Sequence, residues 1–234
     1  AARCVASGKQ VQLEMGGKNP MVVLDDADLD VAVEACINGA FFSTGRLSTA
    51  ARRLSGTEGS HDRFVEARKA RMVTLKIGDA LAAETHIGPV VDAKQLQQDE
   101  DYIRIAREEG GEVFGGERVP GASKGYFLAP ALITGTNNAM RINREEVFGP
   151  VASVVKAKDY DEALALANDT EFGLSAGICT TSLRHATHFK RHVQAGMVMV
   201  NVATAGVDYH VPFGGRKGSS YGPREQGRYA RESY

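Results

Sequence analysis

Short apolar runs alternate along this chain with longer segments in which apolar residues recur every three or four positions. The apolar run at residues 21–24 follows Pro20 and is bounded by acidic residues, which predicts a buried strand. Residues 29–41 predict a helix that Gly45 helps to stop. The apolar positions at helical spacing in this segment are Leu29, Val33, Cys36, Ile37, Ala40 and Phe41.

The same patterns predict further elements along the rest of the chain. Helices are predicted at 61–75, 93–109, 159–168 and 183–194, and strands at 11–15, 127–133, 151–157, 175–181 and 197–201. Residues 1–10 are typical of the end of a helix that stops at Gly8. Because parallel neighbours need a helical crossover, this alternation predicts an α/β fold with a mainly parallel, helix-covered sheet, without predicting its strand order.

Composition narrows the classes of function. The 234 residues include 28 Lys plus Arg and 29 Asp plus Glu, so nucleic acid or an anionic membrane is not predicted as the main partner. No apolar run approaches the roughly 20 residues that span a bilayer, and we expect a soluble, cytoplasmic protein. The three cysteines are far apart, which fits neither a disulfide framework nor a CxxC metal site.

Two possible sites have simpler interpretations. His185, His188 and His192 lie on one predicted helix, but Lys190 and Arg191 between them favour a solvated cationic face, and no metal is predicted. Neither GxGxxG nor GxxxxGK[ST] occurs, so the chain has no sequence signature of a phosphate-binding loop.

GLSAG at 173–177 matches the GxSxG pattern of hydrolases, in which a strand precedes the serine and a helix follows it. Here a helix is predicted before Ser175 and a strand after it. The order favours a packed helix-to-strand turn over a nucleophilic serine.

Three longer segments are more specific. They are LEMGGKNPMVVLDDADLD at 13–30, REEVFGPVASV at 144–154 and VPFGGRKGSSYGPREQGRY at 211–229. Together they resemble the signature segments of the NAD(P)-dependent aldehyde dehydrogenase superfamily, and residues 201–227 are most similar to bacterial α-ketoglutarate semialdehyde dehydrogenases. The resemblance covers essentially the whole chain.

The resemblance implies roles for individual residues. Glu14 matches the general base that activates water, a role that a carboxylate can perform if burial raises its pKa. Glu146 resembles the glutamate that binds the nicotinamide ribose, and Phe148 the aromatic residue beside the nicotinamide ring. Phe213 matches an aromatic wall of the aldehyde pocket, preceded by a variable substrate loop at 203–210.

The nucleophile position departs from the family. Family members carry a cysteine after FFSTG, and here FFSTGRLSTAARRLSG places Ser48 there. A serine needs an adjacent base to act as a nucleophile, whereas a thiol with a pKa of about 8.5 is readily ionised. Other residues nearby also look unlike the family, which leaves engineering, natural decay and a local sequence error as alternatives: Arg46, Leu47, Arg52, Ser55 and Gly56.

By the resemblance, residues 1–13 are a remnant of a coenzyme-binding domain that is otherwise largely absent. Residues 14–218 are the aldehyde dehydrogenase catalytic domain, and residues 219–234 are a C-terminal segment that stops before the oligomerisation strand. The implied cofactor is NAD or NADP, with weak or no binding expected for this chain alone.

The resulting hypothesis is an aldehyde dehydrogenase that oxidises a small aldehyde, such as α-ketoglutarate semialdehyde, to a carboxylate. We expect the isolated chain to be inactive, and to self-associate or to need a partner that supplies the coenzyme domain. Two alternatives are a non-catalytic interaction or oligomerisation module and a serine esterase acting through Ser48 or Ser175.

Overall fold

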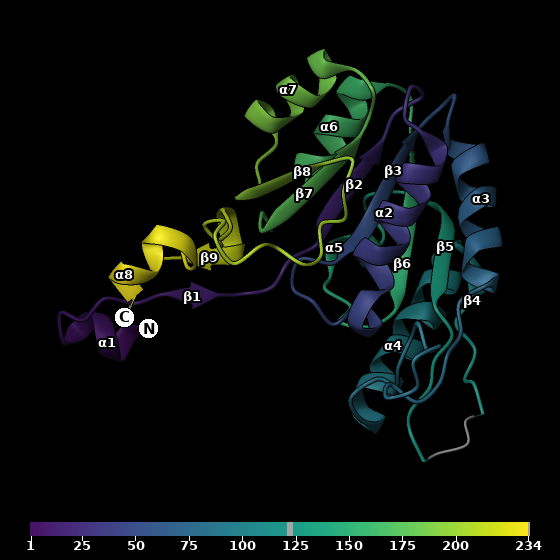
Figure 1. Cartoon of the computed structure of the whole chain (residues 1–234), viewed down its shortest axis with the longest axis horizontal. Helices are drawn as coiled ribbons and strands as arrows, with labels where there is room; N and C mark the ends of the chain where they lie inside the picture. Colours follow the sequence, from purple (N-terminus) through teal and green to yellow (C-terminus); the bar gives the residue numbers. More distant parts are fainter. Residues whose placement is uncertain (121–123, 234) are drawn as a thin grey trace.

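A seven-stranded sheet forms the centre of the molecule, seen in a computed structural model that describes residues 1–120 and 124–233 (Figure 1). Its strand order is β4-β5-β6-β3-β2-β7-β8, and all neighbours are parallel except β4 and β5. The strands are β2 (Asn19–Val23), β3 (Ala51–Thr57), β4 (Glu112–Gly115), β5 (Ala131–Thr136), β6 (Val151–Ala157), β7 (Ser175–Cys179) and β8 (Met197–Val200). The α/β prediction is confirmed.

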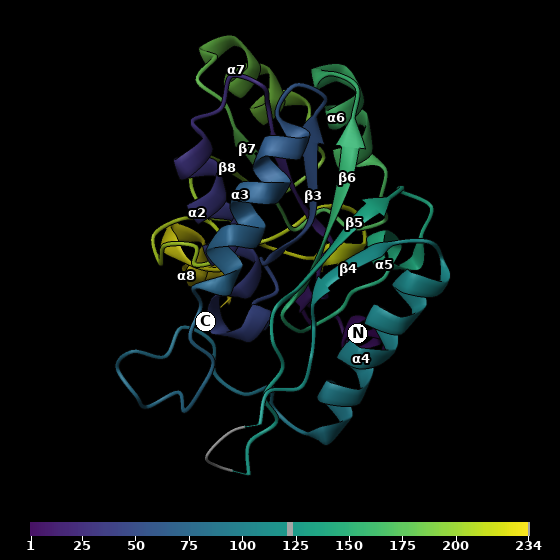
Figure 2. The same ribbon diagram turned by 90° about the vertical axis from the view of Figure 1, so that its right-hand side faces the viewer.

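Helices cover both faces of this sheet (Figures 1 and 2). They are α2 (Leu29–Phe41), α3 (His61–Val73), α4 (Ala93–Glu108), α5 (Arg141–Arg144), α6 (Tyr160–Asn168) and α7 (Leu183–His192). Apolar residues of α2 and α3 pack in one core cluster, those of α6 and α7 in a second, and those of α4 in a third.

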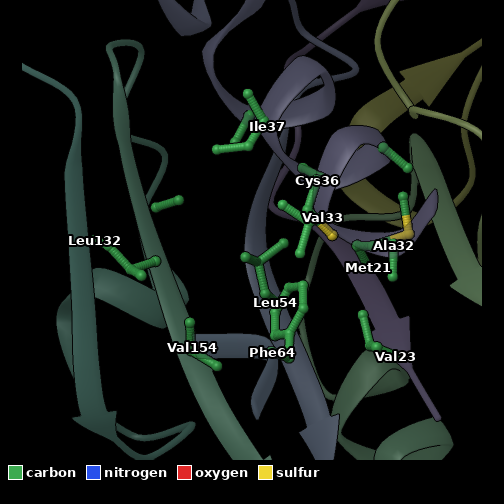
Figure 3. Close-up of a cluster of buried hydrophobic side chains, with 14 of the residues drawn as sticks. Met21, Val23, Ala32, Val33, Cys36, Ile37, Leu54, Phe64, Leu132 and Val154 are labelled. Atoms are coloured by element: carbon green, nitrogen blue, oxygen red, sulfur yellow. The ribbon is translucent and has the colours of Figure 1, made fainter. Parts of the chain in front are cut away.

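Strand β2 shows how alternation sorts side chains between the two faces. Met21 and Val23 lie in the cluster formed with α2 and α3, where Figure 3 shows them beside Cys36 and near Phe64. Val22 lies in the cluster formed with α6 and α7. All of these side chains are fully buried, which is why the run reads as continuously apolar.

Side-chain caps begin four helices. Asp28, Asp92, Asp159 and Ser182 each accept a hydrogen bond from a backbone N–H of the first turn, in α2, α4, α6 and α7 respectively. The predicted starts of these helices are therefore correct to within a residue. The predicted ends are less accurate, since α7 stops at His192, before the predicted end at 194.

Strand β3 was not predicted, although it lies between β6 and β2 in the centre of the sheet. All seven of its residues are buried. The sequence ARRLSGT does not predict a strand, because Arg52 and Arg53 interrupt any apolar or alternating pattern.

The predicted strand at 127–133 is displaced. The structure places β5 at Ala131–Thr136, directly after Pro130, which lacks a backbone donor, and Leu128 forms only an isolated bridge with Arg118. The antiparallel strand β4 was also not predicted.

A second, two-stranded sheet joins the two ends of the chain. Strand β1 (Leu13–Glu14) pairs antiparallel with β9 (Ser220–Tyr221), and both termini lie at this side of the molecule (Figure 1). Helix α1 (Ala2–Ala6) has no buried residue. The division at residues 13/14 and 218/219 stays a prediction. No helix in the described part of the chain is both long and apolar enough to cross a membrane.

Candidate active site

Glu14 lies on β1, opposite Ser220 of β9. Its carboxylate accepts a hydrogen bond of 2.9 Å from the Ser220 hydroxyl. The pKa of Glu14 is raised, chiefly because the surrounding protein partly desolvates the carboxylate, and Glu225 nearby adds repulsion. A raised pKa is what a carboxylate needs in order to accept a proton near neutral pH.

Gly16 and Gly17 lie two and three residues after Glu14, and the backbone here meets Glu146. Gly16 has φ +69°, and a Cβ there would collide with the Glu146 carboxylate. The N–H of Gly17 donates to Glu146 Oε1 at 3.1 Å. A glycine is thus required at position 16, where the backbone meets the carboxylate of Glu146, 129 residues after Gly17.

Asn19, at the start of β2, holds the segment that carries Ser48. Its buried side chain donates to the carbonyls of Ser48 at 2.7 Å and Ala50 at 2.9 Å. Its Oδ1 accepts from the N–H of Ser175 at 3.0 Å. One amide therefore fixes the Ser48 backbone to both β2 and β7.

Neither candidate serine has a base as a partner. The Ser175 hydroxyl is buried and donates to the carbonyl of Thr49 at 3.1 Å, which fits the packed-turn interpretation. Among the described residues, no side chain hydrogen-bonds to the Ser48 hydroxyl, which is partly buried between η1 (Phe42–Gly45) and β3. This geometry lacks the serine–base contact of esterase chemistry.

Arg52 lies beneath this segment and is fully buried. Its guanidinium donates to the carbonyls of Gly45 and Leu47, and its Nη1 is 3.5 Å from Glu146 Oε1. It also lies over the Phe148 ring, 4.9 Å from the centroid. Burial lowers the pKa of Arg52 to about 10, so it remains charged at neutral pH.

Asp99 and Lys18 add buried charge to the same region. Burial raises the pKa of Asp99 to about 6, while Arg52 opposes that shift. Burial also lowers the pKa of Lys18 well below its usual value, and the positive charges of Arg52 and Arg53 contribute. The site therefore combines two carboxylates, Asp99 and Glu146, with cations that the surrounding protein desolvates.

Phe213 is half-buried beside the Glu14 region. Its backbone exchanges two hydrogen bonds with Glu225, which is one of the charges that acts on Glu14. A hollow of about 730 Å³ lies next to it, between β8 and the predicted substrate loop. Its wall includes Val198, Ala203, Val207, Pro212, Arg224 and Tyr229, and it contains neither Glu14, Ser48 nor Glu146.

The structure brings some of the residues that the sequence singled out close to one another. Glu146 and Phe148 share Arg52 as a neighbour, and Glu146 lies against the glycines that follow Glu14. Arg52 and Asp99 were not predicted as site residues. The available signal for Asp99 was an acidic residue on the apolar stripe of α4, among Leu96, Ile103 and Ala106.

The chain was compared with known proteins. The family model described as "Aldehyde dehydrogenase family" matches residues 1–234. The chain is 41% identical over 233 residues to the alpha-ketoglutaric semialdehyde dehydrogenase of Bacillus subtilis, covering 98% of this chain and 48% of that protein. It is 42% identical over 225 residues to the alpha-ketoglutarate semialdehyde dehydrogenase of Haloferax volcanii, covering 94% and 46%. The chain spans about half the length of the curated relatives it matches.

Solved structures agree with the sequence comparison. An NAD-dependent aldehyde dehydrogenase from Sinorhizobium meliloti superposes with a TM-score of 0.93 at 35% identity, covering 98% of this chain and 45% of that one. Betaine aldehyde dehydrogenase from Staphylococcus aureus in complex with NAD+ gives 0.93 at 32% identity, covering 100% and 46%. The matched family model and the shared fold show that this chain belongs to the aldehyde dehydrogenase family.

Proposed function

We propose that this chain is the catalytic portion of an NAD(P)-dependent aldehyde dehydrogenase and that it does not turn over aldehydes by itself. In this proposal Glu14 is the general base, Glu146 and Phe148 contact the nicotinamide end of the cofactor, and Phe213 contacts the aldehyde. Ser48 occupies the nucleophile position. The observation that carries the proposal is the contact of the Glu146 carboxylate with the backbone of Gly17, three residues after Glu14.

Glu14 suits the removal of a proton from water. Partial burial raises the pKa of its carboxylate, while the Ser220 hydroxyl orients one oxygen at 2.9 Å. The residue remains exposed enough for water to reach it. A positioned carboxylate of this kind can assist hydrolysis of an acyl intermediate.

The nicotinamide end of NAD(P) fits the residues present. Glu146 is 27% exposed on its side chain, and among the described residues its partners contact Oε1 alone, which leaves Oε2 to accept a ribose hydroxyl. Phe148 offers a half-buried ring next to it. When bound, the cofactor would accept a hydride from the substrate carbon. We expect weak binding by this chain alone, because its sequence contains no phosphate-binding loop motif.

Ser48 is the reason for the proposed inactivity. Its backbone carbonyl is anchored by Asn19, but its hydroxyl has no recorded base among the described residues. A hydroxyl without a base is a poor nucleophile at neutral pH, whereas a thiol at this position would ionise readily.

For the substrate we propose α-ketoglutarate semialdehyde. Two relatives with that name, from Bacillus subtilis and Haloferax volcanii, support it. A betaine aldehyde dehydrogenase of Mesorhizobium japonicum is 40% identical over 217 residues, so betaine aldehyde is the appropriate competing substrate in an assay.

The test joins the chain to the coenzyme-binding half of a relative, with and without Ser48→Cys, and measures NADH production from both aldehydes. We expect turnover only with Ser48→Cys, faster with the semialdehyde, and lost again on adding Glu14→Gln. Glu58→Gln, which changes an exposed carboxylate elsewhere, is the matched control.

If the fused chain with Ser48→Cys binds NAD and still yields no NADH, the catalytic proposal is wrong. The chain would then be a non-catalytic interaction module, and sedimentation of its complexes would become the informative measurement. If Ser48→Cys alone restores turnover in the 234-residue chain, the proposal that a separate coenzyme-binding half is needed is wrong.

A further inference from the structure

Helices α6 and α7 carry a group of stacked rings on a surface remote from β1 and β9 (Figure 1). The rings of His188 and His192, one helical turn apart, are stacked with centroids 3.9 Å apart at an interplanar angle of 17°. Tyr160 stacks on His185 at 4.6 Å and meets His188 edge-on at 5.6 Å. Both His188 and His192 are exposed.

Hydrogen bonds occupy one nitrogen of each stacked imidazole. His192 Nδ1 is 2.8 Å from the carbonyl of His188 and must carry the proton, since a carbonyl only accepts. His188 Nδ1 is 2.7 Å from the Tyr160 hydroxyl, whose oxygen can accept a hydrogen bond from the Nδ1–H. Within the described part of the chain neither Nε2 has a recorded partner, so both Nε2 lone pairs are available.

We propose that His188 and His192 together bind one divalent transition-metal ion of the imidazole-preferring class, such as Zn²⁺, Ni²⁺ or Cu²⁺. Metal–nitrogen bonds of about 2.0–2.1 Å bring two ligand nitrogens to about 3 Å from each other. The two rings lie one turn apart on one helix, with their centroids 3.9 Å apart, and rotation of the side chains out of their stack would turn both Nε2 lone pairs toward one ion. This inference is independent of the proposed dehydrogenase function.

The ordering of the rings resembles that of built metal sites. A metal-bound histidine commonly donates its second N–H to an oxygen, which sets the tautomer and the ring orientation. Here the His188 carbonyl and the Tyr160 hydroxyl are the oxygens in position for that role. Tyr160 is a positioning residue, and His185 stacked on it limits its motion.

The surroundings restrict which ions bind. Arg184, Lys190 and Arg191 lie on the same helix and repel cations, so an ion held mainly by charge, such as Mg²⁺ or Ca²⁺, is disfavoured. An ion that forms strong bonds to neutral imidazole is favoured, with Cu²⁺ tightest. No cluster of three potential ligands occurs among the described residues, so water completes the coordination and the site stays open to exchange.

The test is calorimetric titration of the chain with Zn²⁺ in a Cys4→Ser background, because Cys4 is the exposed thiol whereas Cys36 and Cys179 are buried. We expect one Zn²⁺ per chain, with affinity falling at least about tenfold for either His188→Gln or His192→Gln. Tyr160→Phe removes only the orienting oxygen and should weaken binding less than either histidine substitution, with the stoichiometry unchanged.

His210→Gln is the matched control, since it changes an exposed histidine outside α7. Metal-free melting temperatures of all variants check that each remains folded, and Zn²⁺ should raise the melting temperature of the parent but not of His192→Gln. Absence of binding to the parent, unchanged affinity in both α7 variants, or an equal loss in His210→Gln would each overturn the proposal.

Discussion

Arg52 and Arg53 are consecutive residues of β3, and their side chains enter regions on opposite faces of the sheet. The two regions differ in the hydrogen-bond partners that they offer to the guanidinium group. The guanidinium of Arg53 donates to Asn138 Oδ1 at 2.9 Å and to the carbonyls of Ala167 and Asp169 at 2.9 and 3.1 Å. Those carbonyls belong to the end of α6, so Arg53 caps a helix from inside the protein.

Arg52 enters the candidate active site. It binds the carbonyls of Gly45 and Leu47 and approaches Glu146, but its Nε and Nη1 have no hydrogen-bond partner in the described structure, whereas in Arg53 this is true of Nε alone. A buried charge with incomplete partners costs free energy of folding. The comparison indicates that the Arg53 side contributes stability, whereas the Arg52 side holds charges that a reactive site can use.

The largest expected loss of stability follows from removing the Arg53 guanidinium. Arg53→Met leaves Asn138 Oδ1 and the Ala167 carbonyl without this donor, while the Asp169 carbonyl keeps its bonds from Asn138 and Arg144, and the free energy of unfolding should fall by about 3–5 kcal/mol. Urea denaturation measures it. Arg107→Met, at an exposed position of α4, is the control and should change the free energy by less than about 0.5 kcal/mol. Equal effects of the two substitutions would contradict the assignment.

The second expected effect is on the pH dependence of stability. Burial raises the pKa of Asp99 to about 6, above an unfolded value of about 3.9, so the folded state binds the extra proton between these values. The contribution of Asp99 to the free energy of unfolding is therefore fully present below about pH 4. It is lost as the pH rises through about 6. Between pH 4 and 7.5, the free energy of unfolding of Asp99→Asn should therefore rise by on the order of 2 kcal/mol relative to that of the parent.

Asp169, on the Arg53 side of the sheet, should give stability the opposite pH dependence. Hydrogen bonds from Arg144 and Asn138 lower the pKa of Asp169, so its contribution is present above its unfolded pKa and is lost as the pH falls through the lower folded value. Denaturation at several pH values should show opposite slopes for Asp99→Asn and Asp169→Asn, each relative to the parent. Parallel slopes would refute the contrast.

A smaller loss is expected from the Arg52 side. Arg52→Met removes two hydrogen bonds but also a desolvated charge with unpaired nitrogens, so the free energy of unfolding should fall by only about 1 kcal/mol. Because Arg52 lowers the pKa of Asp99, the same substitution should shift the Asp99 titration to higher pH. A loss as large as that of Arg53→Met would show that Arg52 is a stabilising residue of the same kind.

The smallest expected effect concerns thiol reactivity. Ser48→Cys should be alkylated by iodoacetamide faster than Cys4, Cys36 or Cys179, and burial raises the pKa of both internal thiols, that of Cys36 to about 11. Arg52 binds the carbonyl of Leu47, next to position 48, so adding Arg52→Met should slow alkylation about threefold.

Peptide mass mapping over time distinguishes the four thiols, and Arg107→Met in the Ser48→Cys background is the matched control. An unchanged alkylation rate after Arg52→Met would mean that the guanidinium does not act on this position.

Sequence alone determined the α/β class and most helices and strands, because apolar spacing and capping residues act over a few neighbouring positions. Strands β6 and β8 were predicted nearly to the residue, and Asp159 and Ser182 marked helix starts correctly. Resemblance of whole segments assigned the family, which the comparisons confirmed. The roles of Glu14, Ser48, Glu146, Phe148 and Phe213 stay predictions.

Tertiary structure alone decided the strand order, the existence of β3 and the contacts within the candidate site. Arg52 and Arg53 look like surface residues to any local rule, since arginine is buried only when distant partners receive it. Those partners come from far along the chain: Arg53 meets Asn138 across 85 positions, and Glu146 meets Gly17 across 129. Such pairings depend on how helices and strands pack, so the periodicity within one segment cannot predict them.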